Sequence, residues 1–232
     1  MPVKFVKSLN YAVEGILHAA KTQRHVRIHF LVIIILLIVC FLLGVQKNDF
    51  IIVSLIAALV IISEIFNSAV ETLVDMVSPR KNEMARVTKD MAAGAVLISA
   101  GTAIIAAFYI LIPYLESFYM NGFKIIKHEN GDIALSAMMI VTLSVIMIKS
   151  YFGKGTPLRG GMPSGHSALS FSAIVSALYS LDSIIAVCAI IIIGFAISLS
   201  RIFQKIHTPL EVFAGMMTGA TITWGMFLVF AA

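Results

Sequence analysis

The stretch FLVIIILLIV at residues 30–39 is apolar throughout and belongs to a longer apolar run over 30–45. Further apolar runs follow along the chain, at 50–77, 91–113, 133–148, 167–181, 183–199 and 209–230. A helix needs about 20 apolar residues to cross a bilayer. The sequence therefore predicts an all-α integral membrane protein with about seven transmembrane helices.

The composition excludes a soluble protein. The chain has 232 residues, of which 59% are hydrophobic and 12% are charged, whereas a soluble domain carries about 25% charged residues. The net charge of +5 fits the orientation of a membrane protein better than nucleic-acid binding, because no stripe of basic and aromatic residues is present. Cys40 and Cys188 lie inside apolar runs, so we interpret both as small core residues.

Residues 3–21 precede the first apolar run and have a different pattern. Apolar side chains recur there at helical spacing, with lysines between them: Val6, Leu9, Val13, Ile16 and Leu17. This spacing predicts an amphipathic helix that lies on the membrane surface. The first 29 residues hold five Lys or Arg and no long apolar core, so we expect no cleaved signal peptide.

The polar stretch 114–132 divides the apolar runs into three before it and four after it. It combines aromatic residues suited to the membrane interface with polar residues typical of turns. We therefore predict a three-helix membrane domain over 1–113, a linker loop over 114–132 and a four-helix membrane domain over 133–232.

Two polar clusters lie at the ends of apolar runs in the second domain. The first is MPSGH at residues 162–166, and the second contains Arg201, His207 and Glu211. A phosphoryl group needs a nucleophile, an acid and fixed positive charge. Two histidines beside cations therefore predict a phosphate site at the membrane.

These clusters resemble the type 2 phosphatidic acid phosphatase superfamily, whose pattern is Lys-x6-Arg-Pro, Pro-Ser-Gly-His and Ser-Arg-x5-His-x3-Asp. The second element is complete in this chain. In the third, Glu211 replaces the Asp. In the first, Lys149 is present, but Thr156 stands in place of the arginine. Arg159, three residues further on, is a candidate to bind the same phosphate.

The resemblance implies a role for each of these side chains. His207 would attack phosphorus and His166 would protonate the leaving oxygen, while Lys149 and Arg201 would bind phosphate oxygens. Ser164 would cap the following helix and leave the amides near Gly165 to bind an anion. Glu211 would fix the tautomer of His207, or serve only in a capping box with Thr208. No metal is required in this half.

An acidic row marks the first domain. Glu64, Asn67, Glu71 and Asp75 have offsets of 0, 3, 7 and 11, so they share one face of a helix. Carboxylates within a membrane segment are costly and indicate a functional site. A row that only pairs with Arg24 and its basic neighbours is the structural alternative, and an ion or proton pathway is another.

Together with Arg24 upstream and the Lys89-Asp90 pair downstream, this row resembles the small bacterial membrane kinases for diacylglycerol and undecaprenol. The resemblance covers residues 5–113. It implies that Glu64 is the general base and Glu71 a Mg²⁺ ligand. The nucleotide end of the site would contain Gln23, Arg24, Asn67, Asp75, Lys89 and Asp90. The family has Glu where this chain has Gln23, so the second Mg²⁺ ligand has lost its charge.

The basic residues predict the orientation. Fourteen Lys and Arg lie in segments that are cytoplasmic if the N-terminus is inside, and three lie in the opposite loops. This asymmetry predicts an inner-membrane protein with its N-terminus in, its C-terminus out and both sites facing the cytoplasm. The kinase resemblance also implies a homotrimer with shared sites, which agrees with the cost of exposing the acidic row to lipid.

We therefore expect a bifunctional membrane lipid enzyme. One half would use Mg²⁺ and ATP to phosphorylate undecaprenol or diacylglycerol, and the other would hydrolyse a lipid phosphate or diphosphate through a phosphohistidine. One alternative is a phosphatase of phosphatidate or phosphatidylglycerophosphate, with a degenerate kinase half as an oligomerisation base. Another is a small proton-coupled transporter.

Overall fold

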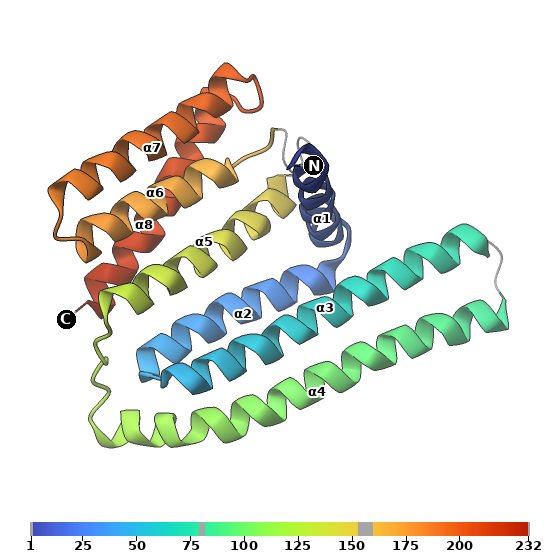
Figure 1. Cartoon of the computed structure of the whole chain (residues 1–232). Coiled ribbons are helices and arrows are strands. Elements are labelled where there is room, and N and C mark those ends of the chain that lie inside the picture. Colours follow the sequence, from blue (N-terminus) through green and yellow to red (C-terminus); the bar gives the residue numbers. More distant parts are fainter. Residues whose placement is uncertain (1, 79–81, 153–159, 232) are drawn as a thin grey trace. The chain divides into compact units, whose positions relative to one another are not determined.

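The computed structural model of this protein describes residues 2–78, 82–152 and 160–231, with the side chains of 2–7 and 9 left aside. These residues form α-helices connected by short loops (Figure 1). The helices are α1 (Pro2–Thr22), α2 (Arg24–Leu43), α3 (Lys47–Val77), α4 (Glu83–Met120), α5 (Asn130–Phe152), α6 (Gly165–Ser180), α7 (Ile184–Phe203) and α8 (Pro209–Phe230).

The prediction of an all-α membrane protein is confirmed. Within the described ranges, α2, α3, α4, α5, α7 and α8 are long and apolar enough to cross a membrane. The run expected to span at 167–181 corresponds to α6, which has 16 residues and is shorter than the usual span of about 20. The amphipathic segment 3–21 forms α1 as expected.

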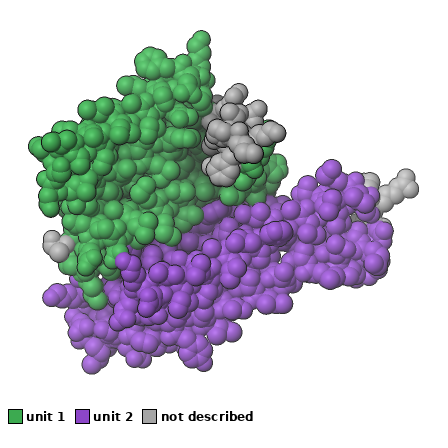
Figure 2. Space-filling view, in the orientation of Figure 1, with its two compact units in different colours: residues 1–22, 126–232 green, residues 23–125 purple. Residues whose placement is uncertain are grey.

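The chain divides into two compact units (Figure 2). Unit 1 contains residues 1–22 and 126–232, and unit 2 contains residues 23–125. The boundary between residues 125 and 126 falls within the expected linker 114–132. Segment 1–22 groups with the C-terminal helices, although the sequence pattern placed it in the first domain.

The expected loop 114–132 is shorter in the structure than predicted, because α4 continues through Pro113 to Met120. Packing supports this extra length of helix. The hydroxyl of Tyr114 donates a hydrogen bond of 2.5 Å to Asp49 near the start of α3. Phe118 packs against a buried cluster that includes Cys40 and Leu111. Tertiary contacts thus outweigh the helix-breaking tendency of the proline.

In unit 2, α3 and α4 pair along their length and α2 packs on α3. A hydrogen bond of 2.7 Å joins the hydroxyls of Ser63 and Ser99 across the α3–α4 pair. Cys40 is buried as predicted, whereas Cys188 in unit 1 is exposed. The prediction for Cys188 was wrong because α7 buries only Gly194 and Ser198 within the chain.

Unit 1 is built around close packing of α6 against α8. A Cβ atom on Gly219 would lie 1.9 Å from the carbonyl oxygen of Ala168, and one on Gly215 would lie 2.3 Å from that of Ser164. Two glycines four residues apart allow helix backbones to approach this closely. Further along, Ser172 and Thr223 share a buried hydrogen bond of 2.7 Å. These contacts fix the N-terminal end of α6, where the MPSGH segment lies.

Candidate functional site

The turn between α7 and α8 positions His207. Its backbone N–H donates to the carbonyl of Arg201 at 3.1 Å, as does that of Ile206. The side chain is buried, and its Nδ1 atom lies 2.9 Å from Oε2 of Glu211. Because Nδ1 is engaged by a carboxylate, Nε2 is the ring nitrogen available to a phosphorus atom.

Glu211 connects the two polar clusters of unit 1. Its Oε1 accepts a hydrogen bond from the backbone N–H of Gly161 at 3.0 Å, while its backbone carbonyl accepts from the N–H of Ser164 at 2.9 Å. The predicted capping box with Thr208 is also present. The two readings of Glu211 are therefore compatible: one carboxylate caps α8 and orients His207.

Ser164 precedes α6 at the cap position, as predicted, but its side chain makes no capping hydrogen bond. The expected cap was wrong in this respect. The Ser164 side chain is fully buried, and its hydroxyl accepts a hydrogen bond of 3.0 Å from Ser167. The hydroxyl is thus directed into the α6 packing instead of toward the helix amides.

Both histidines line one cavity of about 430 Å³ within unit 1. Lys149, Gly165, His166 and His207 form its polar end. Residues of α1, α5 and α6 form the rest of its lining: Asn10, Val13, Ile16, Leu17, Thr142, Val145, Ile146 and Leu169. A polar end and largely apolar walls suit an amphiphile with an anionic head.

The electrostatics of this pocket favour an anion and a neutral histidine. Burial lowers the pKa of His207, and the nearby cations Lys149 and Arg201 lower it further, while the hydrogen bond to Glu211 acts in the opposite direction. The Nε atom of Arg201 is buried and has no hydrogen-bond partner among the described residues. An unpaired buried donor beside two imidazoles is a fitting partner for a phosphate oxygen.

Thr156, Pro157 and Arg159 lie outside the described residues, so the suggestion that Arg159 replaces the missing arginine stays a prediction. Asn10, Val13, Ile16 and Leu17 were not predicted as part of this site. The helical spacing of Val13, Ile16 and Leu17 was visible in the sequence, but we attributed it to the membrane surface.

In unit 2, the acidic row lies along α3. Glu64 is buried, with 5% of its surface exposed. Asn67 donates from Nδ2 to Oε1 of Glu71 at 3.2 Å, and its own Oδ1 is buried without a hydrogen-bond partner in the described part of the chain. An unpaired buried oxygen beside a carboxylate suits a hard cation, which prefers oxygen ligands.

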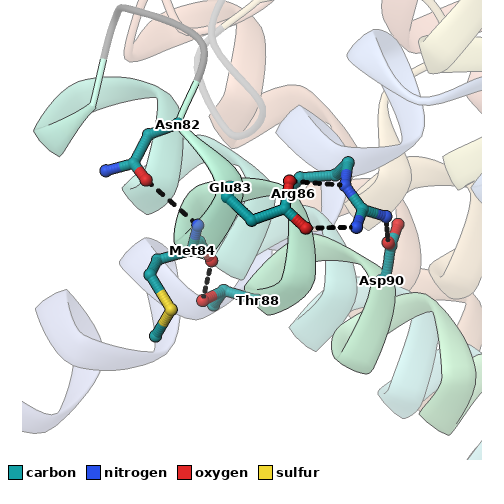
Figure 3. Close-up of polar contacts among 6 residues, drawn as sticks. All are labelled: Asn82, Glu83, Met84, Arg86, Thr88 and Asp90. Carbon is teal, nitrogen blue, oxygen red and sulfur yellow. Dashed lines mark hydrogen bonds and ion pairs between the residues drawn. The ribbon is translucent and has the colours of Figure 1, made fainter.

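The nucleotide end of the predicted site joins α3 to α4. Nζ of Lys89 lies 2.5 Å from Oδ1 of Asp75, so two predicted residues form one ion pair. Asp90 is paired at 2.7 Å with Arg86, which also contacts Glu83 at 2.6 Å (Figure 3). Arg86 was not predicted, although its spacing of four residues from Asp90 is typical of helix ion pairs.

Asn82 starts α4 by accepting a hydrogen bond of 3.0 Å from the N–H of Met84 (Figure 3). Gln23 separates α1 from α2 and forms no side-chain cap on α2. Across residues 2–78, 82–152 and 160–231, no group of three or more His, Cys, Asp or Glu is placed to hold a metal ion. Further Mg²⁺ ligands would have to come from amide oxygens, nucleotide phosphates, water or another protomer.

Comparison with known proteins finds two families along the chain. Residues 10–111 match the prokaryotic diacylglycerol kinase family, and residues 147–232 match the PAP2 superfamily. A diacylglycerol kinase of Synechocystis sp. is 37% identical over 111 residues, covering 47% of this chain and 63% of that protein. An undecaprenol kinase of Bacillus subtilis is 31% identical over 112 residues, covering 48% of this chain and 91% of that protein. No solved structure matches.

The fold and the comparisons thus define a class of bacterial membrane protein in which a domain of the prokaryotic diacylglycerol kinase family is joined to a PAP2 superfamily domain. The chain belongs to the prokaryotic diacylglycerol kinase family through its first half, and its second half is a PAP2 superfamily domain. It spans less than two thirds of the length of the Synechocystis relative.

Proposed function

We propose that this protein is a bifunctional enzyme of the bacterial inner membrane that phosphorylates a lipid alcohol and hydrolyses a lipid phosphate or diphosphate. The observation that carries the phosphatase half is the cavity of unit 1, in which His166, His207 and Lys149 share a polar end. The acidic row of unit 2 and the family match of residues 10–111 support the kinase half.

In the phosphatase reaction, Nε2 of His207 attacks phosphorus and an N–P bond forms as the bond from phosphorus to the leaving oxygen breaks. His166 donates a proton to that oxygen. Water then attacks the phosphohistidine, His166 takes a proton from it, and inorganic phosphate leaves. Lys149, Arg201 and the amides near Gly165 bind the phosphate oxygens.

In the kinase reaction, Glu64 accepts the proton of the lipid hydroxyl. Glu71 and Gln23 would hold Mg²⁺, which would supply positive charge against the charge of the nucleotide phosphates. Arg24 and Asn67, with the two pairs Asp75–Lys89 and Arg86–Asp90, would shape the nucleotide end. The unpaired oxygen of Asn67 beside Glu71 supports this placement of the cation.

Undecaprenol and undecaprenyl diphosphate are the substrates that we favour. Phosphorylation of the first and hydrolysis of the second both give undecaprenyl phosphate, so the two activities do not oppose each other. Diacylglycerol and phosphatidate would form a futile cycle in the same protein. The undecaprenol kinase of Bacillus subtilis among its relatives supports the polyprenyl pairing.

We also propose that the N-terminus is cytoplasmic, the C-terminus is outside and both sites face the cytoplasm, as the distribution of basic residues favours. Assembly as a homotrimer through unit 2 would bury the open part of the acidic row. Glu71 is half-buried and Asp75 is exposed in one chain, which supports ligands or packing supplied by a second protomer.

Gln23 favours a second candidate function, in which the kinase half is degenerate and the protein acts only as a phosphatase. An amide supplies an oxygen ligand but no charge, so Mg²⁺ would bind less tightly. A proton-coupled transporter is the third candidate, because carboxylates within membrane helices also form proton pathways.

A paired assay separates these candidates. Purified wild-type, Glu64→Gln and His207→Ala proteins are tested with labelled ATP and undecaprenol or diacylglycerol, and separately with undecaprenyl diphosphate and phosphatidate. We expect Glu64→Gln to lose only lipid phosphorylation and His207→Ala to lose only phosphate release. If the wild type releases phosphate but forms no labelled lipid, the kinase activity is excluded and the protein is a phosphatase only. Unchanged hydrolysis in His207→Ala would exclude the phosphatase mechanism.

A further inference from the structure

We propose that α1 is a wall of the lipid-phosphate cavity and selects the hydrocarbon chain of the phosphatase substrate. This inference rests on the proposed phosphatase function of unit 1 and adds a specificity element to it. Neither the kinase match over residues 10–111 nor the phosphatase match over 147–232 assigns such a role to α1.

The lining of the cavity carries the argument. Val13, Ile16 and Leu17 of α1 border the same space as His166 and His207. Offsets of three and four residues place these side chains on one helix face. Apolar side chains this close to a phosphate site would contact the part of the substrate nearest its head group.

Burial shows that this face is packed against protein. Leu17 is 3% exposed and Ala20 is fully buried, and α1 packs on α5, which carries Lys149. Gly15 and His18, on the opposite face of the same helix, are exposed. A helix that lay only on a membrane surface would leave its apolar face open to lipid instead.

The opposite wall is also apolar. Val145 and Ile146 of α5 and Leu169 of α6 line the cavity. A hydrocarbon chain between these residues and α1 would exchange lipid contacts for protein contacts of similar polarity, so the fit of its shape to the two walls would decide which chain is accepted. The first carbons of the substrate would therefore run between α1 and the α5–α6 pair.

Asn10 and Thr142 add polar groups to this mainly apolar lining. The hydroxyl of Thr142 already donates to the backbone carbonyl of Met138 at 2.8 Å, so the amide of Asn10 is the donor on offer. A substrate with a second polar segment, such as the second phosphate of a diphosphate or the ester groups of a glycerolipid, would accept a hydrogen bond from Asn10. A simple alkyl phosphate would leave this donor unused.

Hydrolysis of substrates with different chains tests this proposal. Ile16→Trp fills the cavity and Ile16→Ala enlarges it. Ala12→Trp is the control, because it introduces the same indole side chain at an exposed position. We expect Ile16→Trp to lower kcat/KM for undecaprenyl and farnesyl diphosphate by about tenfold or more. Para-nitrophenyl phosphate has no lipid chain, so its hydrolysis should change much less. Ile16→Ala should shift the preference toward bulkier chains.

Identical chain preferences in Ile16→Trp, Ala12→Trp and the wild type would overturn the role of α1. Inhibition by vanadate gives a further check, because this phosphate analogue engages only the polar end. It should remain as effective in Ile16→Trp as in the wild type, and a large loss would show general damage to the site instead of chain selection.

A binding experiment keeps this inference separate from the catalytic one. In a Cys188→Ala, His207→Ala protein, Ile16→Cys is labelled with a water-soluble maleimide, with Ala12→Cys as the matched position. We expect undecaprenyl phosphate to protect Ile16→Cys several-fold and to leave Ala12→Cys unprotected. If undecaprenyl phosphate protects Ile16→Cys but the wild-type protein hydrolyses no lipid phosphate, the proposed hydrolysis is refuted and the role of α1 as a wall of the lipid cavity stands. Hydrolysis by the wild type without protection would refute the wall alone.

Discussion

Units 1 and 2 hold their functional residues in different ways. In unit 1, Glu211 contacts His207, Gly161 and Thr208, so hydrogen bonds within one chain connect the residues around the cavity. In unit 2, the acidic row lies along α3, and its ion pair with α4, between Asp75 and Lys89, is exposed. The proposed phosphatase site is therefore organised before substrate arrives, whereas the proposed kinase site would depend on nucleotide, metal or another protomer to complete it.

The largest effect should come from the residue that organises unit 1. Glu211→Gln replaces the carboxylate with an amide of similar size and removes the negative charge beside His207. We expect kcat of phosphate release to fall by about 10²- to 10⁴-fold, with lipid phosphorylation unchanged. Without the charge of Glu211, which supports the protonated ring, the pKa of His207 should fall further. The acid limb of the pH–rate profile should then move to lower pH.

Thr208→Ala is the control for this experiment. It removes the hydroxyl of the capping box but leaves the contact between Glu211 and His207 in place. We expect a loss of about 1 kcal/mol in stability with kcat retained within a few-fold. An equal loss of kcat in both variants would mean that Glu211 acts through the helix cap and not through His207.

The next effect concerns packing. In Gly219→Ala, the new methyl group would lie 1.9 Å from a backbone oxygen of Ala168, so α6 and α8 must separate. We expect unit 1 to lose about 3 kcal/mol or more, measured as a lower Tm in detergent, and phosphatase activity to fall with it. Gly225→Ala in the same helix has open space around it and should behave as the wild type.

Gln23→Glu tests whether the kinase site is incomplete. Adding a carboxylate should lower the Mg²⁺ concentration for half-maximal lipid phosphorylation by about tenfold, because ligand charge sets the affinity for hard cations. The measurement is a Mg²⁺ titration at fixed ATP, with phosphate release by unit 1 as the reference activity. An unchanged titration would show that Gln23 does not contact the metal.

The smallest effect should come from Arg86. Its contacts with Glu83 and Asp90 are exposed to solvent, where water and salt weaken such pairs. Arg86→Ala should therefore change the KM for ATP by about twofold, with Arg86→Lys between it and the wild type. A loss of tenfold or more would place Arg86 in direct contact with the nucleotide.

The fold was largely predictable because each apolar run is long and the bilayer permits few alternatives to a helix. The pairing of His207 with Glu211 was also predictable, since a spacing of four residues restricts the geometry. The extension of α4 past Pro113 was not, because it depends on Tyr114 and Phe118 meeting distant residues. The burial of Ser164 against Ser167 depends similarly on how α6 packs.

The place of α1 was unpredictable for another reason. An apolar helix face has the same pattern whether it meets lipid or protein, so Val13, Ile16 and Leu17 alone do not distinguish the two.

Arg86 shows the limit for charged residues. Its spacing from Asp90 indicates an ion pair, but it does not indicate whether that pair contacts the nucleotide.

The grouping of residues 1–22 with the C-terminal helices bears on how the gene can be dissected. The loop before α5 is the natural place to cut the coding sequence into two independent proteins. A product beginning at residue 126 would contain His166 and His207 but lack α1, which lines the cavity beside them. We expect such a truncated protein to retain the polar residues of the cavity and to lose one of its apolar walls. Co-expression of the N-terminal peptide should restore that wall.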